Sequence, residues 1–358
     1  MINNIISYMY LLNKVSFNLS SWIKRLHTMS KSNNNHCNYN HSPLYALPIG
    51  YCFNEFEIEK IINKDELGIV YRAWDHRLNC MIAIKEYIPS FLVKREQDLE
   101  LKLRKGSFQK RYQTGLTRFI QEAHVMSYFH HPCLPFFLRL WQNNHTAYIA
   151  TPFYDGMTLK TLQAVQPKMI NQRWICNILY PLLDAINTLH QAGYLHCDIS
   201  PDTILIQEDG VPILFDFSST RKITDRLSDE FEVTIRPGFT PIEHYTNNEE
   251  EDQQGAWTDI YALGATLYTL ITGCPPPVSI VRNIEDNYQS LVKLRPEGYS
   301  FSFLHAIDCT LALQPSERPM SISELITLME SSTGESSPSL TLSGSGALSD
   351  ILTPTRLL

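Results

Sequence analysis

Short runs of apolar and β-branched residues dominate the part of the chain that begins near residue 55. The spacing of these runs predicts strands at Ile58–Ile62, Ile69–Trp74, Met81–Tyr87, Leu138–Trp141 and Tyr148–Thr151. Between the third and the fourth run, apolar residues at helical spacing predict a helix from Leu116 to Phe129. Small strands with one helix are typical of a compact α+β unit.

After residue 156 the pattern is mostly helical. One apolar face continues over three turns and predicts an amphipathic helix ending near Gly193, built on Ile175, Ile178, Leu179, Leu182, Leu183 and Ile186. Further helices are expected over Trp257–Ile271 and near 302–312 and 321–330. Ser, Thr, Gly and Pro dominate residues 331–358, which we expect to form a disordered tail.

Charge and composition narrow the classes of function. The chain has 358 residues, of which 44% are hydrophobic, and a net charge of −7. It therefore lacks the overall basic field of a nucleic-acid-binding protein. The eight cysteines are scattered without a Cys-x-x-Cys pair, which favours reduced thiols and a cytoplasmic protein. The chain contains no uncharged run of about 18 apolar residues, so the sequence predicts no transmembrane segment.

The first residues allow two interpretations. Residues 1–54 contain four Lys or Arg residues and no acid, and we treat them as an N-terminal extension that is largely disordered. Apolar residues at helical spacing within 1–28 are compatible with a helix on an anionic membrane surface. A start at Met29, with the preceding residues as an extension outside the fold, is the favoured interpretation.

Four charged residues carry the candidate chemistry. Lys85 ends an apolar strand in MIAIKEY, and Glu122 follows on the predicted helix in RFIQEA. Asp198 in YLHCDISPDTILI and Asp216 in ILFDFSS come directly after strand-like runs. A lysine–glutamate pair of this kind positions the phosphates of a nucleotide. One aspartate then orients a hydroxyl nucleophile and the other holds Mg²⁺.

With these motifs in this order, residues 55–330 resemble the eukaryotic-type (Hanks-type) protein serine/threonine kinases that also occur in bacteria. The resemblance implies a bilobal protein-kinase-like fold of α+β class, with a β-rich N-lobe at 55–151 and a mainly helical C-lobe at 155–330. Three more residues match structural positions of that C-lobe: Glu243 in GFTPIEHY, Asp259 in WTDIYAL and Arg318 in ERP, which pairs with Glu243 in the family. Small-molecule kinases lack this C-lobe, so they are the weakest hypothesis.

The resemblance also implies a reaction, in which the γ-phosphoryl group of ATP passes to a Ser or Thr hydroxyl of a protein substrate. Asp198 would orient the acceptor, and Lys85, held by Glu122, would anchor the phosphates. Asp216 and Thr203 would hold Mg²⁺, with Mn²⁺ as an alternative. The nucleotide would lie against Ile62, Gly68, Val70, Thr151, Pro152 and Tyr154, with Thr151 as gatekeeper.

Several family positions hold other residues. Asn63 and Asp65 replace the first two glycines of Gly-x-Gly-x-x-Gly, so side chains obstruct the backbone and a carboxylate repels the phosphates. The catalytic-loop arginine, lysine and asparagine are replaced, and so is the glycine after Asp-Phe: the residues are Cys197, Ser200, Thr203 and Ser218. Losing one preorganised contact costs about 10²–10³ in rate. A weak kinase is favoured, and the alternative is a pseudokinase that binds a nucleotide or acts as a scaffold for a partner.

One segment has an unusual charge. Residues 88–118 contain eight Lys or Arg residues and three acids, and they lie between Lys85 and Glu122. We expect a solvated loop here, with a docking site for an acidic partner as the alternative.

Overall fold

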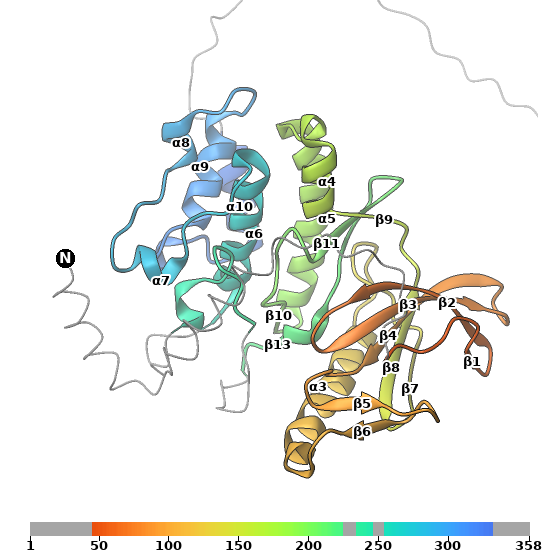
Figure 1. Ribbon diagram of the computed structural model, residues 1–358. Coiled ribbons are helices and arrows are strands. Elements are labelled where there is room, and N and C mark those ends of the chain that lie inside the picture. The colour runs from red at the N-terminus through yellow and green to blue at the C-terminus, as the bar shows by residue number, and fades with distance from the viewer. Residues whose placement is uncertain (1–44, 225–233, 246–253, 332–358) are drawn as a thin grey trace, which may run out of the picture.

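A computed structural model describes residues 45–224, 234–245 and 254–331 (Figure 1). The predictions for residues 1–28 and for most of the tail lie outside these ranges. The N-terminal lobe is built on an antiparallel sheet with the strand order β1-β2-β3-β4-β8-β7. These strands are β1 (Cys52–Phe53), β2 (Phe56–Lys64), β3 (Gly68–Asp75), β4 (Cys80–Tyr87), β7 (Arg139–Asn143) and β8 (Thr146–Pro152). The five strands predicted from the apolar runs are confirmed, each close to its predicted bounds.

Helix α3 (Gln109–Ser127) packs against this sheet. Its buried face includes Phe119, Glu122 and Ala123. The predicted helix exists but begins at Gln109 rather than at Leu116, because its first two turns expose polar residues and lack the apolar face on which the prediction rested. Tyr112 anchors these turns, with its ring 5.5 Å from that of Tyr87.

The expectation of a solvated loop over residues 88–118 is wrong. Strands β5 (Val93–Arg95) and β6 (Leu101–Leu103) form a hairpin there, followed by the start of α3. Apolar residues of this segment are buried against the sheet: Ile88, Leu92, Val93 and Leu101. The positive charge of the segment led to the prediction of a solvated loop. One of these charges, Arg95, instead points inward and pairs with Glu86.

The C-terminal lobe is mainly helical, and its core is continuous with the inner face of α3. Its helices are α4 (Leu159–Val165), α5 (Gln172–Gln191), α6 (Ala256–Thr272), α7 (Ser279–Arg282), α8 (Leu291–Leu294), α9 (Phe301–Thr310) and α10 (Ile322–Glu330). Helices α6 and α9 approach closely at Gly264, where an added Cβ would lie 1.8 Å from Thr310 Oγ1. The four helices predicted here are confirmed, and α4, α7 and α8 were not predicted.

Small strands between the lobes position the candidate chemistry. Strand β10 (Tyr194–Leu195) pairs with β13 (Arg221–Lys222), and β11 (Ile204–Gln207) lies between β9 (Gly156–Thr158) and β12 (Pro212–Leu214). Along the chain, Asp198 follows β10 and Asp216 follows β12, so each aspartate lies in the loop after one of these short strands.

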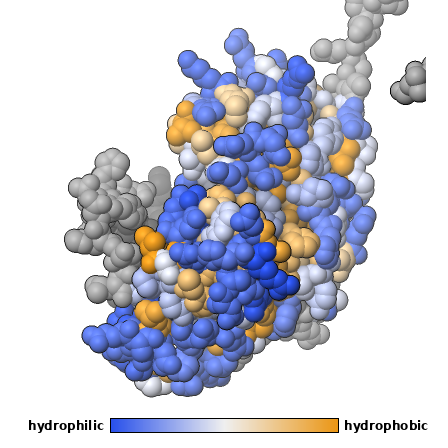
Figure 2. Space-filling model, turned by 90° about the vertical axis from the view of Figure 1, so that its right-hand side faces the viewer, coloured by the Kyte–Doolittle hydropathy of each residue, from blue (hydrophilic) through white to orange (hydrophobic). Residues whose placement is uncertain are grey.

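To cross a bilayer, a helix needs about 20 mostly apolar residues. Within residues 45–224, 234–245 and 254–331, no helix is both long and apolar enough to cross a bilayer. Figure 2 shows a mostly hydrophilic face on which hydrophobic residues form only small groups.

Candidate active site

Three of the four predicted charged residues meet in one cluster. Lys85 Nζ on β4 lies 2.8 Å and 3.1 Å from the two carboxylate oxygens of Glu122 on α3. The same ammonium lies 3.1 Å from Asp216 Oδ1. Lys85 therefore joins a strand, a helix and the loop after β12 through one cation, and the two lobes meet at this point.

Lys85 and Asp216 each stabilise the charged form of the other. Burial by itself would lower the pKa of Lys85, but the nearby Asp216 and Glu122 outweigh burial and raise that pKa above its ordinary value. Burial would likewise raise the pKa of Asp216, but the Lys85 ammonium holds it below its ordinary value. At neutral pH the site therefore contains a fixed cation beside an ionised carboxylate.

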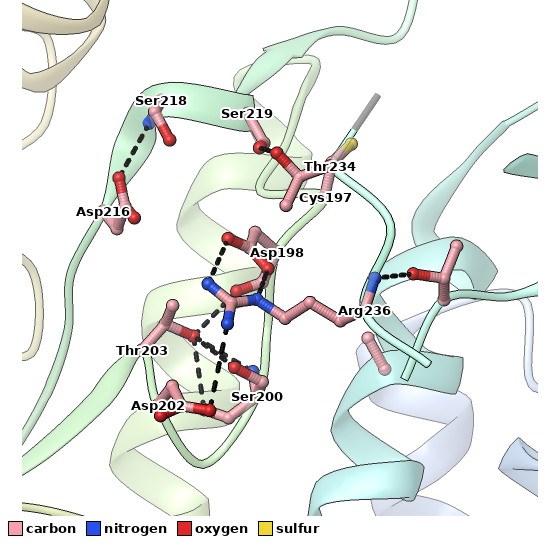
Figure 3. A network of polar contacts seen from close by, with 12 residues as sticks. Cys197, Asp198, Ser200, Asp202, Thr203, Asp216, Ser218, Ser219, Thr234 and Arg236 are labelled. Atoms are coloured by element: carbon pink, nitrogen blue, oxygen red, sulfur yellow. Dashed lines mark hydrogen bonds and ion pairs between the residues drawn. The ribbon is translucent and has the colours of Figure 1, made fainter. Parts of the chain in front are cut away.

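Asp198, the fourth predicted residue, faces a partner that the sequence analysis did not identify. Arg236 donates from Nε to Asp198 Oδ1, and its Nη2 lies 2.9 Å from Asp198 Oδ2 (Figure 3). The same guanidinium lies 3.8 Å from Asp202 Oδ2. Burial raises the pKa of Asp198, and the Arg236 guanidinium opposes that rise.

The loop that carries Asp198 is hydrogen-bonded to the side chain of Asp259 on α6. The backbone N–H groups of His196 and Cys197 donate to its two carboxylate oxygens, each at 2.8 Å. His190 on α5 lies 2.8 Å from the same carboxylate. Cys197 has a φ of 63°, in the left-handed region that side chains disfavour. The buried Asp259 fixes the loop in this conformation.

Thr203 closes the same loop. Its hydroxyl donates to the Asp198 carbonyl at 2.7 Å and accepts the Ser200 N–H at 3.0 Å (Figure 3). Thr203 and Ser200 are both buried. The structure thus places the Thr203 hydroxyl in the support of the loop, and its role as a metal ligand stays a prediction.

The turn between β2 and β3 is closed by Asp65. Its Oδ1 accepts the N–H groups of Leu67 at 2.8 Å and Gly68 at 2.7 Å. An anion bound at this turn would need those same N–H groups. The carboxylate of Asp65 therefore already accepts two N–H groups that an anion bound at this turn would use.

The other residues predicted to line the nucleotide site lie on the sheet and at its exit. Val70 on β3 is directly opposite Lys85 in the strand register. Thr151 and Pro152 end β8, where they pair with Ala83 and Ile82 of β4. Two further predicted residues are engaged differently: Ile62 is exposed at an irregularity in β2, and Tyr154 accepts the Phe136 N–H through its hydroxyl.

The model of the protein kinase domain family matches residues 56–328. The chain belongs to the protein kinase family. Its curated relatives include serine/threonine-protein kinase PknB of Mycobacterium tuberculosis, which is 26% identical over 283 residues, 76% of this chain and 42% of that protein. A probable serine/threonine-protein kinase PknB of Lactococcus lactis is 28% identical over 191 residues, 51% of this chain and 30% of that protein.

With these relatives, the chain falls in the Hanks-type serine/threonine group of the family. The chain spans less than half the length of the curated relatives just named. The solved structure of PpkA-294 in its apo form matches with a TM-score of 0.73 and 53% sequence identity. The match covers 80% of this chain and 100% of the PpkA-294 chain.

The kinase C-lobe contains a second buried ion pair. Arg318 Nη1 lies 2.8 Å from Glu243 Oε1, and Nη2 lies 3.1 Å from Oε2. Thr258 donates to the same carboxylate at 3.0 Å, and the guanidinium lies over the Tyr261 ring at 4.7 Å. The structure thus brings together the two residues that the sequence analysis paired, and they fasten the segment before α6 to the end of the kinase domain.

Two features of the kinase site escaped the sequence analysis, namely Arg236 at Asp198 and the closure of the β2–β3 turn by Asp65. A signal for the first was present, because Ser200 leaves the catalytic loop without its family lysine and a cation has to come from elsewhere. Arg236 lies in the segment between Asp216 and Glu243. Asp65 was recognised as a repelling charge, but its hydrogen bonds to the turn were not.

Proposed function

We propose that this chain is an ATP-dependent protein serine/threonine kinase that transfers the γ-phosphoryl group of ATP to a protein hydroxyl. The observation that carries the proposal is the Lys85 ammonium in contact with both Glu122 and Asp216, with the Asp198 carboxylate on the neighbouring loop. This arrangement joins a phosphate anchor, a metal-binding carboxylate and a base in one site.

Each residue then has a defined task. The acceptor hydroxyl oxygen forms a bond to the γ-phosphorus while the bond from that phosphorus to the β,γ-bridging oxygen breaks, and ADP leaves. Asp198 accepts the proton of the hydroxyl. Lys85, held in place by Glu122, binds the phosphate oxygens. A bound Mg²⁺ supplies charge neutralisation across the phosphates.

The residues present fit a hard divalent cation. Asp216 uses Oδ1 for its contacts with Lys85 and with the Ser218 N–H. Carboxylate oxygens are the ligands that Mg²⁺ and Mn²⁺ favour, and Mg²⁺ keeps several waters when phosphates share its coordination. Asp216 is therefore the principal protein ligand that we propose, with Thr203 as the weaker candidate.

The test is transfer of radiolabelled phosphate from ATP to a generic basic protein and to the chain itself, with Mg²⁺ and separately with Mn²⁺. The wild type and Asp198→Asn are compared. We expect label transfer by the wild type that falls to background in Asp198→Asn. Equal signals from the two proteins in both metals would overturn the proposal.

A pseudokinase is the second candidate, and Asp65 favours it. Its carboxylate fills the phosphate-binding N–H groups of the turn. The test is the thermal stabilisation of the chain by nucleotide with and without Mg²⁺, since a ligand at 100 times its Kd adds about 2.7 kcal/mol. Stabilisation by nucleotide without any phosphate transfer would support this candidate.

We also infer that the kinase acts on a protein partner in the cytoplasm. Within the described residues the seven cysteines are free thiols, as a reducing compartment favours. Mass spectrometry of the protein isolated from its own cells, with thiols blocked at lysis, tests this, and disulfides between these cysteines would contradict it.

A further inference from the structure

The cation at the Asp198 carboxylate comes from outside the catalytic loop. Arg236 lies 38 residues further along the chain and binds both carboxylate oxygens of Asp198. Its guanidinium also faces Asp202, and the charge of Asp216 acts on it as well (Figure 3). Arg236 thus contacts the carboxylates of both Asp198 and Asp202.

The catalytic loop itself offers no substitute at the position where the family has lysine. Ser200 is fully buried, and its hydroxyl lies 3.4 Å from that of Thr203. A serine side chain is too short to bring a hydrogen-bond donor from this position to the carboxylate, and it carries no charge. Arg236, by contrast, presents a planar fork that matches both oxygens of a carboxylate.

Arg236 is fixed from its own backbone. Its N–H donates to Thr240 Oγ1 at 2.8 Å, and its carbonyl accepts the N–H groups of Phe239 and Thr240, each at 3.0 Å. Thr240 is anchored in turn by Ser279 of α7, whose hydroxyl donates to its carbonyl at 2.7 Å. The turn needs Gly238, with a φ of +87°, because a Cβ there would lie 2.8 Å from the Pro276 carbonyl oxygen.

We propose that Arg236 is the positioning residue for Asp198, holding its carboxylate in the orientation in which it accepts the proton of the acceptor hydroxyl. The inference rests on the proposed kinase function. It makes the turn at 236–240 part of the site, because the reaction needs this turn in place. Each carboxylate oxygen has two lone pairs, so Asp198 keeps the capacity to accept a hydroxyl while Arg236 is bound.

The test compares Arg236→Met and Arg236→Lys with the wild type and with Arg139→Met. Arg139 is the matched control, since it forms a partly exposed pair with Glu55 on the edge of the N-terminal sheet. For each protein we would measure kcat, the KM for ATP and the rise in Tm caused by ADP. Free guanidinium ion at millimolar concentration is then added to Arg236→Met and to Asp198→Asn.

We expect kcat of Arg236→Met to fall by about 10²–10³, the usual cost of one preorganised electrostatic contact, with the ADP-induced rise in Tm unchanged. The kcat of Arg236→Lys should lie between that of the wild type and that of Arg236→Met, because an ammonium group restores the charge but not the planar, two-pronged geometry of the guanidinium. Guanidinium should recover part of the rate in Arg236→Met and none in Asp198→Asn.

If the wild type shows transfer that depends on Asp198, three results would overturn the inference alone. The first is a kcat of Arg236→Met within about threefold of the wild-type value. The second is a kcat of Arg236→Met above that of the wild type, which would make Arg236 inhibitory. The third is loss of the ADP-induced rise in Tm together with the activity, which would make the role of Arg236 structural. A wild type without transfer that depends on Asp198 would overturn the proposed function, and this inference with it.

Discussion

At the scale of single residues, the side chain of Asp65 closes the turn between β2 and β3. Its carboxylate accepts two backbone N–H groups of that turn, although the side chain itself is exposed. An incoming phosphate has to displace this carboxylate and also meets its negative charge. In the proposed kinase, Asp65 would therefore compete with a nucleotide phosphate for this turn.

We predict that Asp65→Gly binds Mg-ATP about tenfold more tightly, which corresponds to about 1.4 kcal/mol. The change frees both N–H groups and removes the charge. Isothermal titration calorimetry measures the Kd, and Asp65→Asn separates the two effects because it keeps the acceptor oxygen and loses only the charge. Unchanged or weaker binding by Asp65→Gly would contradict the prediction.

His244 is a second single residue with a measurable effect. Burial lowers its pKa to about 3, with the charges of Arg221 and Arg318 acting in the same direction and Asp259 against them. In the unfolded chain a histidine titrates near pH 6.5. As the pH falls below about 6.5, the unfolded state gains a proton that the folded state does not take up, and the folded state loses stability.

We therefore predict that His244→Gln flattens the dependence of stability on pH between about pH 6 and pH 5. The wild type should lose roughly 1 kcal/mol per pH unit more than this variant, within the limit of about 1.4 kcal/mol per unit for one proton. Urea titrations at several pH values give the free energy of unfolding. His124→Gln, which changes an exposed histidine of α3, is the control and should keep the wild-type slope.

At the scale of elements, the hairpin β5–β6 supports the strand that carries Lys85. Arg95 Nη2 lies 2.5 Å from Glu86 Oε1, and both side chains are almost fully buried. The hydroxyls of Tyr71 and Tyr148 donate to the two oxygens of the same carboxylate, each at 2.7 Å. Glu86 follows Lys85 on β4, so this network fixes the strand on the side away from the nucleotide residues.

We predict that Arg95→Met lowers the free energy of unfolding by about 3 kcal/mol or more, because it leaves the Glu86 carboxylate buried without its cation. Lys94→Met is the matched control, since this neighbouring residue forms an ion pair with Glu96 at the surface, where water screens the attraction. Urea denaturation measures both variants. A loss for Arg95→Met no larger than that of the control would show that the hairpin does not support the sheet.

At the scale of the whole molecule, two buried contacts connect distant parts of the C-lobe. Asp259 of α6 accepts hydrogen bonds from the backbone of the catalytic loop, and Arg318 forms an ion pair with Glu243, which lies 75 residues earlier in the chain. Both carboxylates lie at the N-terminal side of α6, Asp259 within the helix and Glu243 through Thr258. Helix α6 is therefore the common support for the catalytic loop and for the segment that carries Arg236.

We predict that Arg318→Met loosens this support without affecting the N-terminal sheet. Amide hydrogen exchange should show lost protection in α6, in residues 234–245 and near Ala312, whose carbonyl accepts a bond from Arg318. Protection of β3 and β4 should stay at the wild-type level. The double variant Glu243→Gln/Arg318→Met should regain part of the protection, since it removes the uncompensated buried charge. Uniform loss across both lobes would contradict the prediction.

Much of the fold and part of the site could be predicted from the chain alone. Strand and helix periodicity located the main sheet and the long helices, and Lys85, Glu122, Asp198 and Asp216 were recognised by their order and context. The hairpin at β5–β6 was missed because its apolar residues alternate with charges. Pattern reading assigns a charged residue to the surface, whereas Arg95 is drawn inside by a carboxylate that is itself buried.

The sequence by itself determined the main strands of the N-terminal sheet, helix α3 and the four longer helices of the C-lobe, because backbone periodicity and apolar burial are local properties of the chain. It also singled out Lys85, Glu122, Asp198 and Asp216 as the candidate residues for the chemistry. Only the tertiary structure decided the partner of Asp198, since its contact with Arg236 joins segments 38 residues apart. Such pairs depend on where the packed helices and turns bring two loops together, and no local pattern records that distance.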